Sequence, residues 1–326
     1  MIGRRRLLYT GFGLGASALL VPRLLTAFDP GWGFQAPWHQ PVAASSKLSV
    51  GGAVVQVDFG EGEFRLAQSD VVAWVRRAAE AVACYYGRFP VTAARVLVLP
   101  SSGRGIHNGT TWGNVGGMPA FTRIRLGERT SVEQLRDDWM MTHELLHIGL
   151  PSLPEQNHWL EEGTAVYVEP IARVQVGQLS EELVWRDMMR DMPQGQPERG
   201  DEGLDRTHSW ARTYWGGAGF CLLADVEMRK RTQNRKGLRD ALRGIVEAGG
   251  TIAHDWEIVP TLEAGDRATG TQVLTQLYNR MRDNAVPIDF EGLWKQLGVA
   301  ESNGSISFNA KAPLADVRQA IFAKSA

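Results

Sequence analysis

Apolar side chains recur at helical spacing in the stretch that follows residue 68. They fit one face of a helix at i, i+3 and i+4 and are Val71, Trp74, Val75, Ala78, Val82 and Tyr85. Ser69 precedes this pattern as a candidate N-cap, and Gly87 and Pro90 follow it. The pattern therefore predicts an amphipathic helix that starts near Ser69 and ends before Gly87.

Three segments have the composition of β-strands. Residues 50–59 are rich in strand formers and are interrupted by a Gly-Gly pair, and residues 96–99 form a short apolar run typical of a buried strand. Residues 121–126 alternate between two sets of side chains, which is typical of an edge strand. The Gly- and Ser-rich residues 101–118 are predicted to form a loop.

Helical patterns dominate the rest of the chain. Thr130 and Glu133 form a candidate capping box at the start of a helix that is predicted to run to Gly149. Further helices are predicted over residues 158–173, 180–191, 210–231, 236–248, 268–283 and 289–297. A helix and strands followed almost only by helices predict an α+β fold with a helical C-terminal part.

Composition narrows the classes of function. The 326 residues are 44% hydrophobic and 22% charged, an ordinary globular balance. Lys and Arg number 35 against 36 for Asp and Glu, so the net charge of −1 offers no basic excess for nucleic acid. Cys84 and Cys221 are too few for a Cys-rich zinc site, so His and carboxylate would have to hold any metal ion. We expect two unpaired core thiols, with a single disulfide as the alternative.

The first 27 residues have the layout of an export signal. Arg4, Arg5 and Arg6 precede a Gly-diluted apolar stretch, which is typical of a twin-arginine signal. The nearest small-residue cleavage site is Leu25-Thr26-Ala27. The pattern predicts export to the periplasm or out of the cell. The alternatives are an uncleaved membrane anchor over residues 7–25 and an ordinary buried helix.

An HELLH sequence at residues 143–147 carries the candidate chemistry. His143 and His147 are four residues apart, so both imidazoles project from one helix face and can share a metal ion, with Glu144 leaning to the same side. The alternative is a solvated helix face that happens to carry two histidines. Residues 159–169, WLEEGTAVYVE, add carboxylates on a second predicted helix. Two His and one Glu would leave the fourth position of a zinc ion open for water, as in catalytic sites.

These two segments resemble those of the gluzincin metallopeptidases, specifically the aminopeptidase N and glycyl aminopeptidase groups. The resemblance covers roughly residues 65–230. It implies a thermolysin-like catalytic domain with a small mixed sheet, whose edge strand borders a cleft, packed on the HExxH helix. It also implies that Glu162, rather than Glu161, is the third zinc ligand. Glu169 would then orient a zinc-bound histidine; the alternative is a solvated acid at the helix end.

Two other segments extend the resemblance. Tyr214 matches the family tyrosine that stabilises the oxyanion; a core tyrosine is the alternative, and His208 is a weaker candidate. Residues 116–120, GGMPA, occupy a place comparable to the G-x-M-E-N segment of the aminopeptidase N group. Pro119 and Ala120 replace the acid and the amide there. In that family the acid binds the free α-amine of the substrate, so its replacement here counts against aminopeptidase activity, and the choice between endo- and exo-cleavage stays open.

The sequence thus predicts four regions. They are an export signal or anchor at 1–27, an irregular Pro/Gly/Trp-rich arm and strand at 28–60, a metallopeptidase catalytic domain at 61–231, and a helical C-terminal region at 232–326.

The predicted function is hydrolysis of peptide bonds with one Zn²⁺ per chain, in which Glu144 takes a proton from the metal-bound water. The alternative is an exported, non-catalytic binding or assembly module that retains the fold. A metal-independent hydrolase is not favoured, because the sequence has no G-x-S-x-G segment. The expected partner is a peptide or protein substrate. No nucleic acid is expected, and membrane contact only through an uncleaved N-terminal segment.

Overall fold

A computed structural model describes residues 38–324 of the chain. The predicted export signal, residues 1–27, lies outside this range. Within it, none of the helices has both the length and the apolar character that crossing a bilayer requires.

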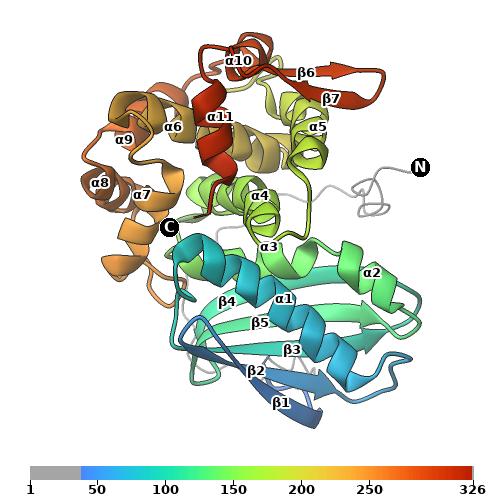
Figure 1. Ribbon diagram of the computed structural model, residues 1–326. Helices are drawn as coiled ribbons and strands as arrows, with labels where there is room; N and C mark the ends of the chain where they lie inside the picture. The colour runs from blue at the N-terminus through green and yellow to red at the C-terminus, as the bar shows by residue number, and fades with distance from the viewer. Residues whose placement is uncertain (1–37, 325–326) are drawn as a thin grey trace.

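Five strands form a mixed sheet at one end of the molecule (Figure 1). In spatial order they are β1 (Val42–Val50), β2 (Ala53–Gly60), β3 (Ala93–Ser101), β5 (Met118–Gly127) and β4 (Ile106–Val115). β2, β3 and β5 are parallel, while β1 and β4 pair antiparallel with their neighbours at the two edges. Helix α1 (Gln68–Tyr86) connects the parallel strands β2 and β3 and lies across one face of the sheet.

The apolar face of α1 explains why this helix forms. Val71, Val75 and Val82 are fully buried, in one apolar cluster with strand residues such as Val57 and Val96. The helix predicted near residue 70 is therefore confirmed. Its predicted cap is wrong, because the N-cap residue is Ala67 and no side chain bonds there.

Three predictions about the strands are wrong. Residues 42–47, expected in an irregular arm, belong to β1, which turns into β2 at two glycines with positive φ. Residues 106–115, expected in a loop, form β4. Residues 121–126, expected in an edge strand, lie in the interior strand β5, and β4 is the edge strand beside it. Periodicity missed β4 because its polar and glycine residues are mostly half-buried, so no apolar alternation marks it.

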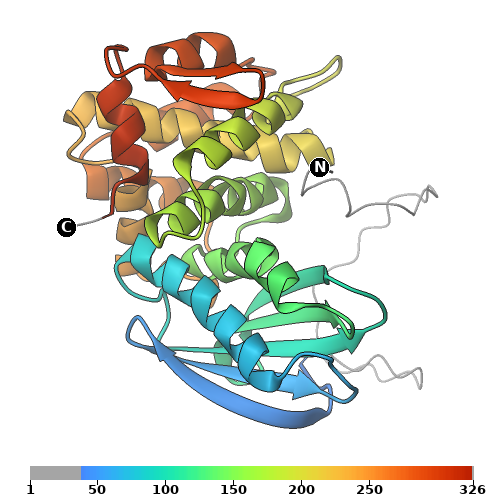
Figure 2. The same ribbon diagram turned by 45° about the vertical axis from the view of Figure 1, so that its right-hand side comes forward.

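Helices form the rest of the molecule, with α3 and α4 between the sheet and helices α6 to α11 (Figures 1 and 2). The helices after α1 are α2 (Val132–Asp137), α3 (Met140–Leu146), α4 (His158–Gln175), α5 (Glu181–Asp191), α6 (Gly217–Thr232), α7 (Leu238–Glu247), α8 (Ile258–Thr269), α9 (Val273–Met281), α10 (Phe290–Leu297) and α11 (Ala315–Phe322). Short 3₁₀ or π segments lie at His147–Gly149, Glu155–Asn157, Met192–Gly195 and Arg212–Gly216.

The C-terminal region differs from the prediction in three places. It contains a hairpin of β6 (Val299–Ser302) and β7 (Ser305–Phe308), which turns at Asn303 and Gly304, both at positive φ. The helix expected over 268–283 is the end of α8 followed by α9, because the chain leaves α8 through a left-handed Gly270. α8 itself and α11 were not predicted.

The predicted helix from Thr130 to Gly149 is divided. Ser131 and Gln134, rather than Thr130 and Glu133, form the capping box of α2, and the chain breaks between α2 and α3. At the break, the carboxylate of Asp138 accepts hydrogen bonds from the backbone N–H groups of Met140 and Met141, at 3.0 Å each, and from the indole of Trp74 at 2.9 Å. Asp138 therefore ties the start of α3 to α1.

Burial raises the pKa of Asp138 to about 6, although the three hydrogen bonds oppose that shift. The unfolded chain titrates near the ordinary value, about 3.9. The stabilising contribution of a carboxyl group with a raised folded pKa is complete below its unfolded pKa and is lost as the pH rises through its folded pKa.

We therefore expect the free energy of unfolding of the parent, relative to Asp138→Asn, to fall by about 2 kcal/mol between pH 4 and pH 7. Urea unfolding of both proteins across this range measures it. Asp289→Asn is the control, because Asp289 makes a similar cap bond to Gly292 at an exposed site. A difference between parent and Asp138→Asn that stays constant with pH would contradict a half-buried Asp138 that titrates in this range.

Candidate metal centre

Close packing of helices fixes the second half of the HExxH…E pattern. A Cβ atom on Gly163 would lie 2.2 Å from the backbone carbon of Gly217, and one on Gly217 would lie 2.2 Å from the carbonyl oxygen of Trp159. Only glycine permits this approach of α4 to the start of α6. Glu162 therefore projects from a helix whose position is set by backbone contact.

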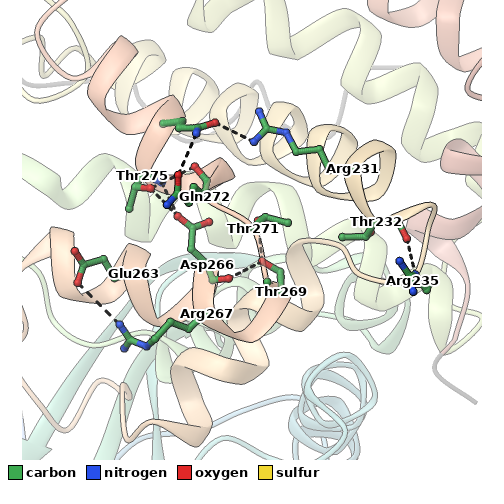
Figure 3. Close-up of a pocket in the computed structure, with 12 residues that line it drawn as sticks. Arg231, Thr232, Arg235, Glu263, Asp266, Arg267, Thr269, Thr271, Gln272 and Thr275 are labelled. Atoms are coloured by element: carbon green, nitrogen blue, oxygen red, sulfur yellow. Dashed lines mark hydrogen bonds and ion pairs between the residues drawn. The ribbon is translucent and has the colours of Figure 1, made fainter.

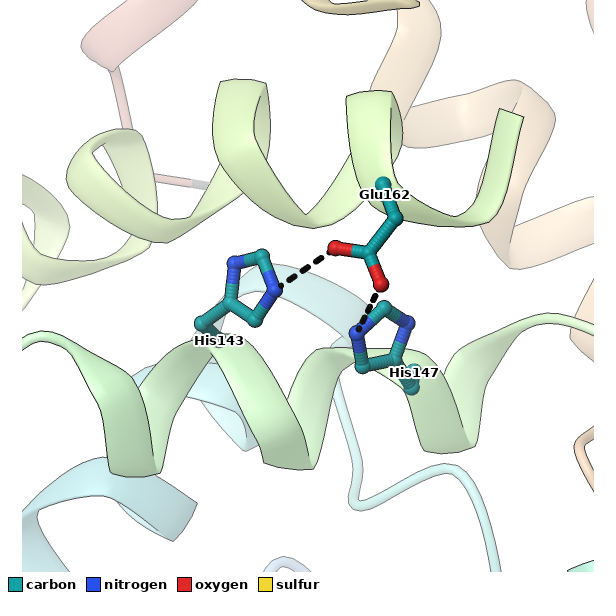
Figure 4. A group of neighbouring side chains, drawn as sticks. All are labelled: His143, His147 and Glu162. Atoms are coloured by element: carbon teal, nitrogen blue, oxygen red, sulfur yellow. Dashed lines mark hydrogen bonds and ion pairs between the residues drawn. The ribbon is translucent and has the colours of Figure 1, made fainter. Parts of the chain in front are cut away.

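The structure brings together His143 of α3, His147 at the start of the 3₁₀ turn that follows α3, and Glu162 of the facing helix α4 (Figure 4). Nε2 of His143 lies 3.1 Å from Oε2 of Glu162, and Nε2 of His147 lies 3.8 Å from Oε1. Zinc ligands at about 2.0–2.2 Å in a tetrahedral arrangement are about 3.3–3.6 Å apart. The donor types fit a single zinc ion, and the three ligand atoms lie within 4.8 Å of one another, close to the spacing that such an ion requires.

The charge of Glu162 is held by its neighbours. Burial alone would raise the pKa of Glu162, but His147 and then His143 and His158 outweigh burial and hold that pKa well below its usual range. Glu162 is thus a buried carboxylate, 7% exposed, in contact with imidazoles. A carboxylate and imidazoles are the ligand types that Zn²⁺ takes in catalytic sites.

Glu144 lies next to this group and is held by the edge strand. The hydroxyl of Thr111 on β4 donates to Oε2 of Glu144 at 2.8 Å and is 3.0 Å from the carbonyl oxygen of the same residue. Burial raises the pKa of Glu144, against the lowering effects of His147 and the Thr111 bond. Gly109 provides the space, since a Cβ there would lie 2.5 Å from Cγ of Glu144.

Aromatic rings surround His143. The ring of Tyr214, on the π-helical segment Arg212–Gly216, stacks parallel to it with centroids 6.3 Å apart. Trp139 meets the imidazole edge-on at 5.3 Å, and Trp210 stacks on Tyr214 at 5.5 Å. The structure thus places Tyr214 beside the group, while the rival candidate His208 is exposed.

Glu169 is buried two turns farther along α4. Its carboxylate accepts a hydrogen bond from Arg173 at 2.8 Å, within a buried ion pair. Nδ1 of His143 is buried and has no hydrogen-bond partner among the described residues. That Glu169 orients a ligand histidine stays a prediction.

Two residues of the site were not identified from the sequence. Thr111 lies in a segment that was predicted to be a loop. Only the pairing register of β4 shows that its side chain faces Glu144. His158 bonds to Glu161 at 2.8 Å and to Glu162 at 3.2 Å. Its i, i+4 spacing to Glu162 was a usable signal. The hydrogen bond to Glu161 and then that to Glu162 raise the pKa of His158 to about 10.

An open hollow of about 910 Å³ lies elsewhere, between α6 and the α8–α9 corner (Figure 3). Its arginines have partners: Arg231 donates to Gln276, and Arg267 faces Glu263. None of its lining residues belongs to the His-His-Glu group.

Comparison with known proteins indicates the fold. No family model and no curated protein matches the sequence. Among solved structures, an aminopeptidase N family protein from Idiomarina loihiensis superposes with a TM-score of 0.60 at 10% identity, over 83% of this chain and 53% of that one. An M1 zinc metallopeptidase from Deinococcus radiodurans superposes with a TM-score of 0.47 at 15% identity, over 76% of this chain and 52% of that one.

The similarity to the Idiomarina protein shows that the chain has the same kind of α+β fold, with a mixed sheet and many helices. The chain spans about half the length of the solved proteins it matches.

Gly109→Ala tests the packing of β4 on Glu144. The added methyl group overlaps a buried side chain, so we expect the free energy of unfolding to fall by about 1–3 kcal/mol. Thr110→Ala, at the adjacent strand position whose side chain lies on the other face of β4, should cost less than about 1 kcal/mol. Urea denaturation of the two variants and the parent gives both values. Equal stability of Gly109→Ala and the parent would show that β4 does not pack there.

Proposed function

We propose that the chain is a zinc-dependent peptidase that hydrolyses peptide bonds, with His143, His147 and Glu162 as ligands of one zinc ion. The observation that carries the proposal is the convergence of these three donors beside Glu144, a buried carboxylate that coordinates nothing in this arrangement. A binding site for zinc alone needs no such acid. A hydrolase does, because proton transfer to and from the reacting groups needs a positioned base.

A bound zinc ion would supply two things: a water of lowered pKa and a polarised substrate carbonyl. The protein supplies the rest. His143 and Glu162 are 4% and 7% exposed, so two of the three ligands are largely shielded from water, in an environment where electrostatic interactions are stronger than in water. The similarity of fold to an aminopeptidase N family protein supports this assignment.

Glu144 acts as the general base and then as the general acid. Thr111 occupies one carboxylate oxygen, Oε2, so Oε1 is left to take the proton and later deliver it to the leaving amine. Burial raises the pKa of Glu144, and a more basic carboxylate accepts a proton more readily. The fixed hydrogen bond to Thr111 keeps the side chain oriented during both transfers.

Tyr214 is the candidate donor to the developing oxyanion. Its ring is stacked on His143, and this contact holds the side chain that bears the hydroxyl in place relative to the metal ligands. One such donor contributes about 2.7–4 kcal/mol to transition-state stabilisation in other hydrolases.

Among residues 38–324, β4 is an edge strand with a neighbour on one side only, and its other side offers backbone groups to an extended peptide beside Glu144. A peptide or protein is therefore the proposed substrate. We also propose that the chain is exported, which rests on residues 1–27 alone.

The second candidate, a non-catalytic binding module, predicts that Glu144 has no function. It gains no support from the geometry, because Glu144 is buried and held by Thr111 rather than solvated.

Loss of one ligand tests the zinc site. His147→Ala should reduce zinc from one ion per chain to a small fraction, because two remaining donors bind zinc far more weakly than three. His208→Ala, which removes an exposed histidine, should retain the full amount. Plasma mass spectrometry of the purified proteins measures the metal. Full zinc in His147→Ala would refute the ligand set.

Glu144→Gln separates enzyme from binding module. The amide keeps the size of the side chain but not its basicity, so turnover of a peptide substrate should fall about 10²-fold or more while zinc stays bound. Glu155→Gln, in the exposed turn before α4, is the control. A broad peptide-library digest identifies the substrate. Full activity of Glu144→Gln would remove Glu144 as the base, and a zinc-loaded parent that cleaves no peptide would favour the binding module.

A further inference from the structure

His158 is the first residue of α4, one turn before Glu162. Its side chain is 52% exposed, yet both ring nitrogens are engaged. Nε2 lies 3.2 Å from Oε1 of Glu162, and Nδ1 lies 2.8 Å from Oε2 of Glu161. An ionised carboxylate only accepts hydrogen bonds, so Nδ1 donates to Glu161, while Nε2 faces Glu162 in an ion-pair contact.

The two oxygens of Glu162 are not equivalent. Oε2 is the one near His143, at 3.1 Å, whereas Oε1 is 3.8 Å from His147 and closer to His158. The contact of His158 with Oε1 and the hydrogen bond of His143 to Oε2 together therefore hold the rotation of the carboxylate about its last torsion. In a glutamate without such contacts, this terminal torsion is broad and roughly two-fold.

The same contacts connect the ligand to the chain between the two zinc helices. Glu161 accepts the backbone N–H of Leu153 at 3.2 Å through its other oxygen, Oε1. A continuous series of polar contacts thus runs from the connecting segment through Glu161 and His158 to Glu162. These contacts hold the imidazole through both of its ring nitrogens, although the ring is half exposed.

We propose that His158 is a positioning residue, which presents the Glu162 carboxylate to the metal ion in a single orientation. The proposal rests on the zinc centre proposed above. Groups that hydrogen-bond to a metal ligand hold it in its binding geometry, and their loss typically costs about 10- to 100-fold in metal affinity. An exposed ion pair without this role would contribute almost nothing to the stability of the protein.

Zinc affinity tests the proposal without any need for turnover. Competition with a chromophoric chelator should show that His158→Ala binds zinc about 10- to 100-fold more weakly than the parent, and still takes up one ion per chain at saturating zinc. His158→Gln should recover most of the affinity, since its amide nitrogen can occupy the place of Nε2. His208→Ala is the matched loss of an exposed histidine and should leave affinity unchanged.

Each result decides the matter. Parent-like affinity in His158→Ala would overturn the proposal, as would equal losses in His158→Ala and His158→Gln. Failure of His158→Ala to reach one zinc at saturation would make His158 a ligand rather than a positioning residue. If circular dichroism shows that His158→Ala is unfolded, His158→Gln carries the test, and a 10-fold or larger loss in that variant would overturn the proposal. The peptidase proposal fails separately, when a zinc-loaded parent cleaves no peptide.

Discussion

The packing of α3 and the turn after it against α4 brings ligand atoms of two imidazoles and a buried carboxylate within 4.8 Å of one another. A buried carboxylate without compensating charge or hydrogen bonds would cost several kcal/mol. Here Glu162 has imidazole nitrogens on both oxygens, and its pKa is held low. The group of one carboxylate and its imidazole neighbours is therefore stable, and it presents the donors that a zinc ion needs.

Other features of the fold maintain this packing. The contact of Gly163 with Gly217 sets α4 against α6, and Asp138 ties the start of α3 to Trp74 of α1. Thr111 connects the sheet edge to Glu144. These contacts come from five separate elements, α1, β4, α3, α4 and α6, so the position of the candidate base relative to the ligands depends on the whole of the sheet-and-helix assembly.

Part of the site could be predicted from local spacing, because His143 and His147 are one helical turn apart. Glu162 lies on another helix, and only the resemblance to the gluzincins implied it rather than Glu161; the structure groups Glu162 with the two histidines. The strand β4 could not be predicted, since its contacts with β5 and α3 are tertiary and its residues are mostly polar or glycine. The break at Asp138 was missed for the same reason: a distant partner, Trp74, stabilises it.

The central claim is that one zinc ion lies among His143, His147 and Glu162. A crystal structure of the zinc-loaded protein, with anomalous diffraction data collected on both sides of the zinc edge, tests it most directly. The account predicts one strong peak, about 2.0–2.2 Å from Nε2 of each histidine and from one oxygen of Glu162. A zinc peak at any other position, or none at these three side chains, would contradict it.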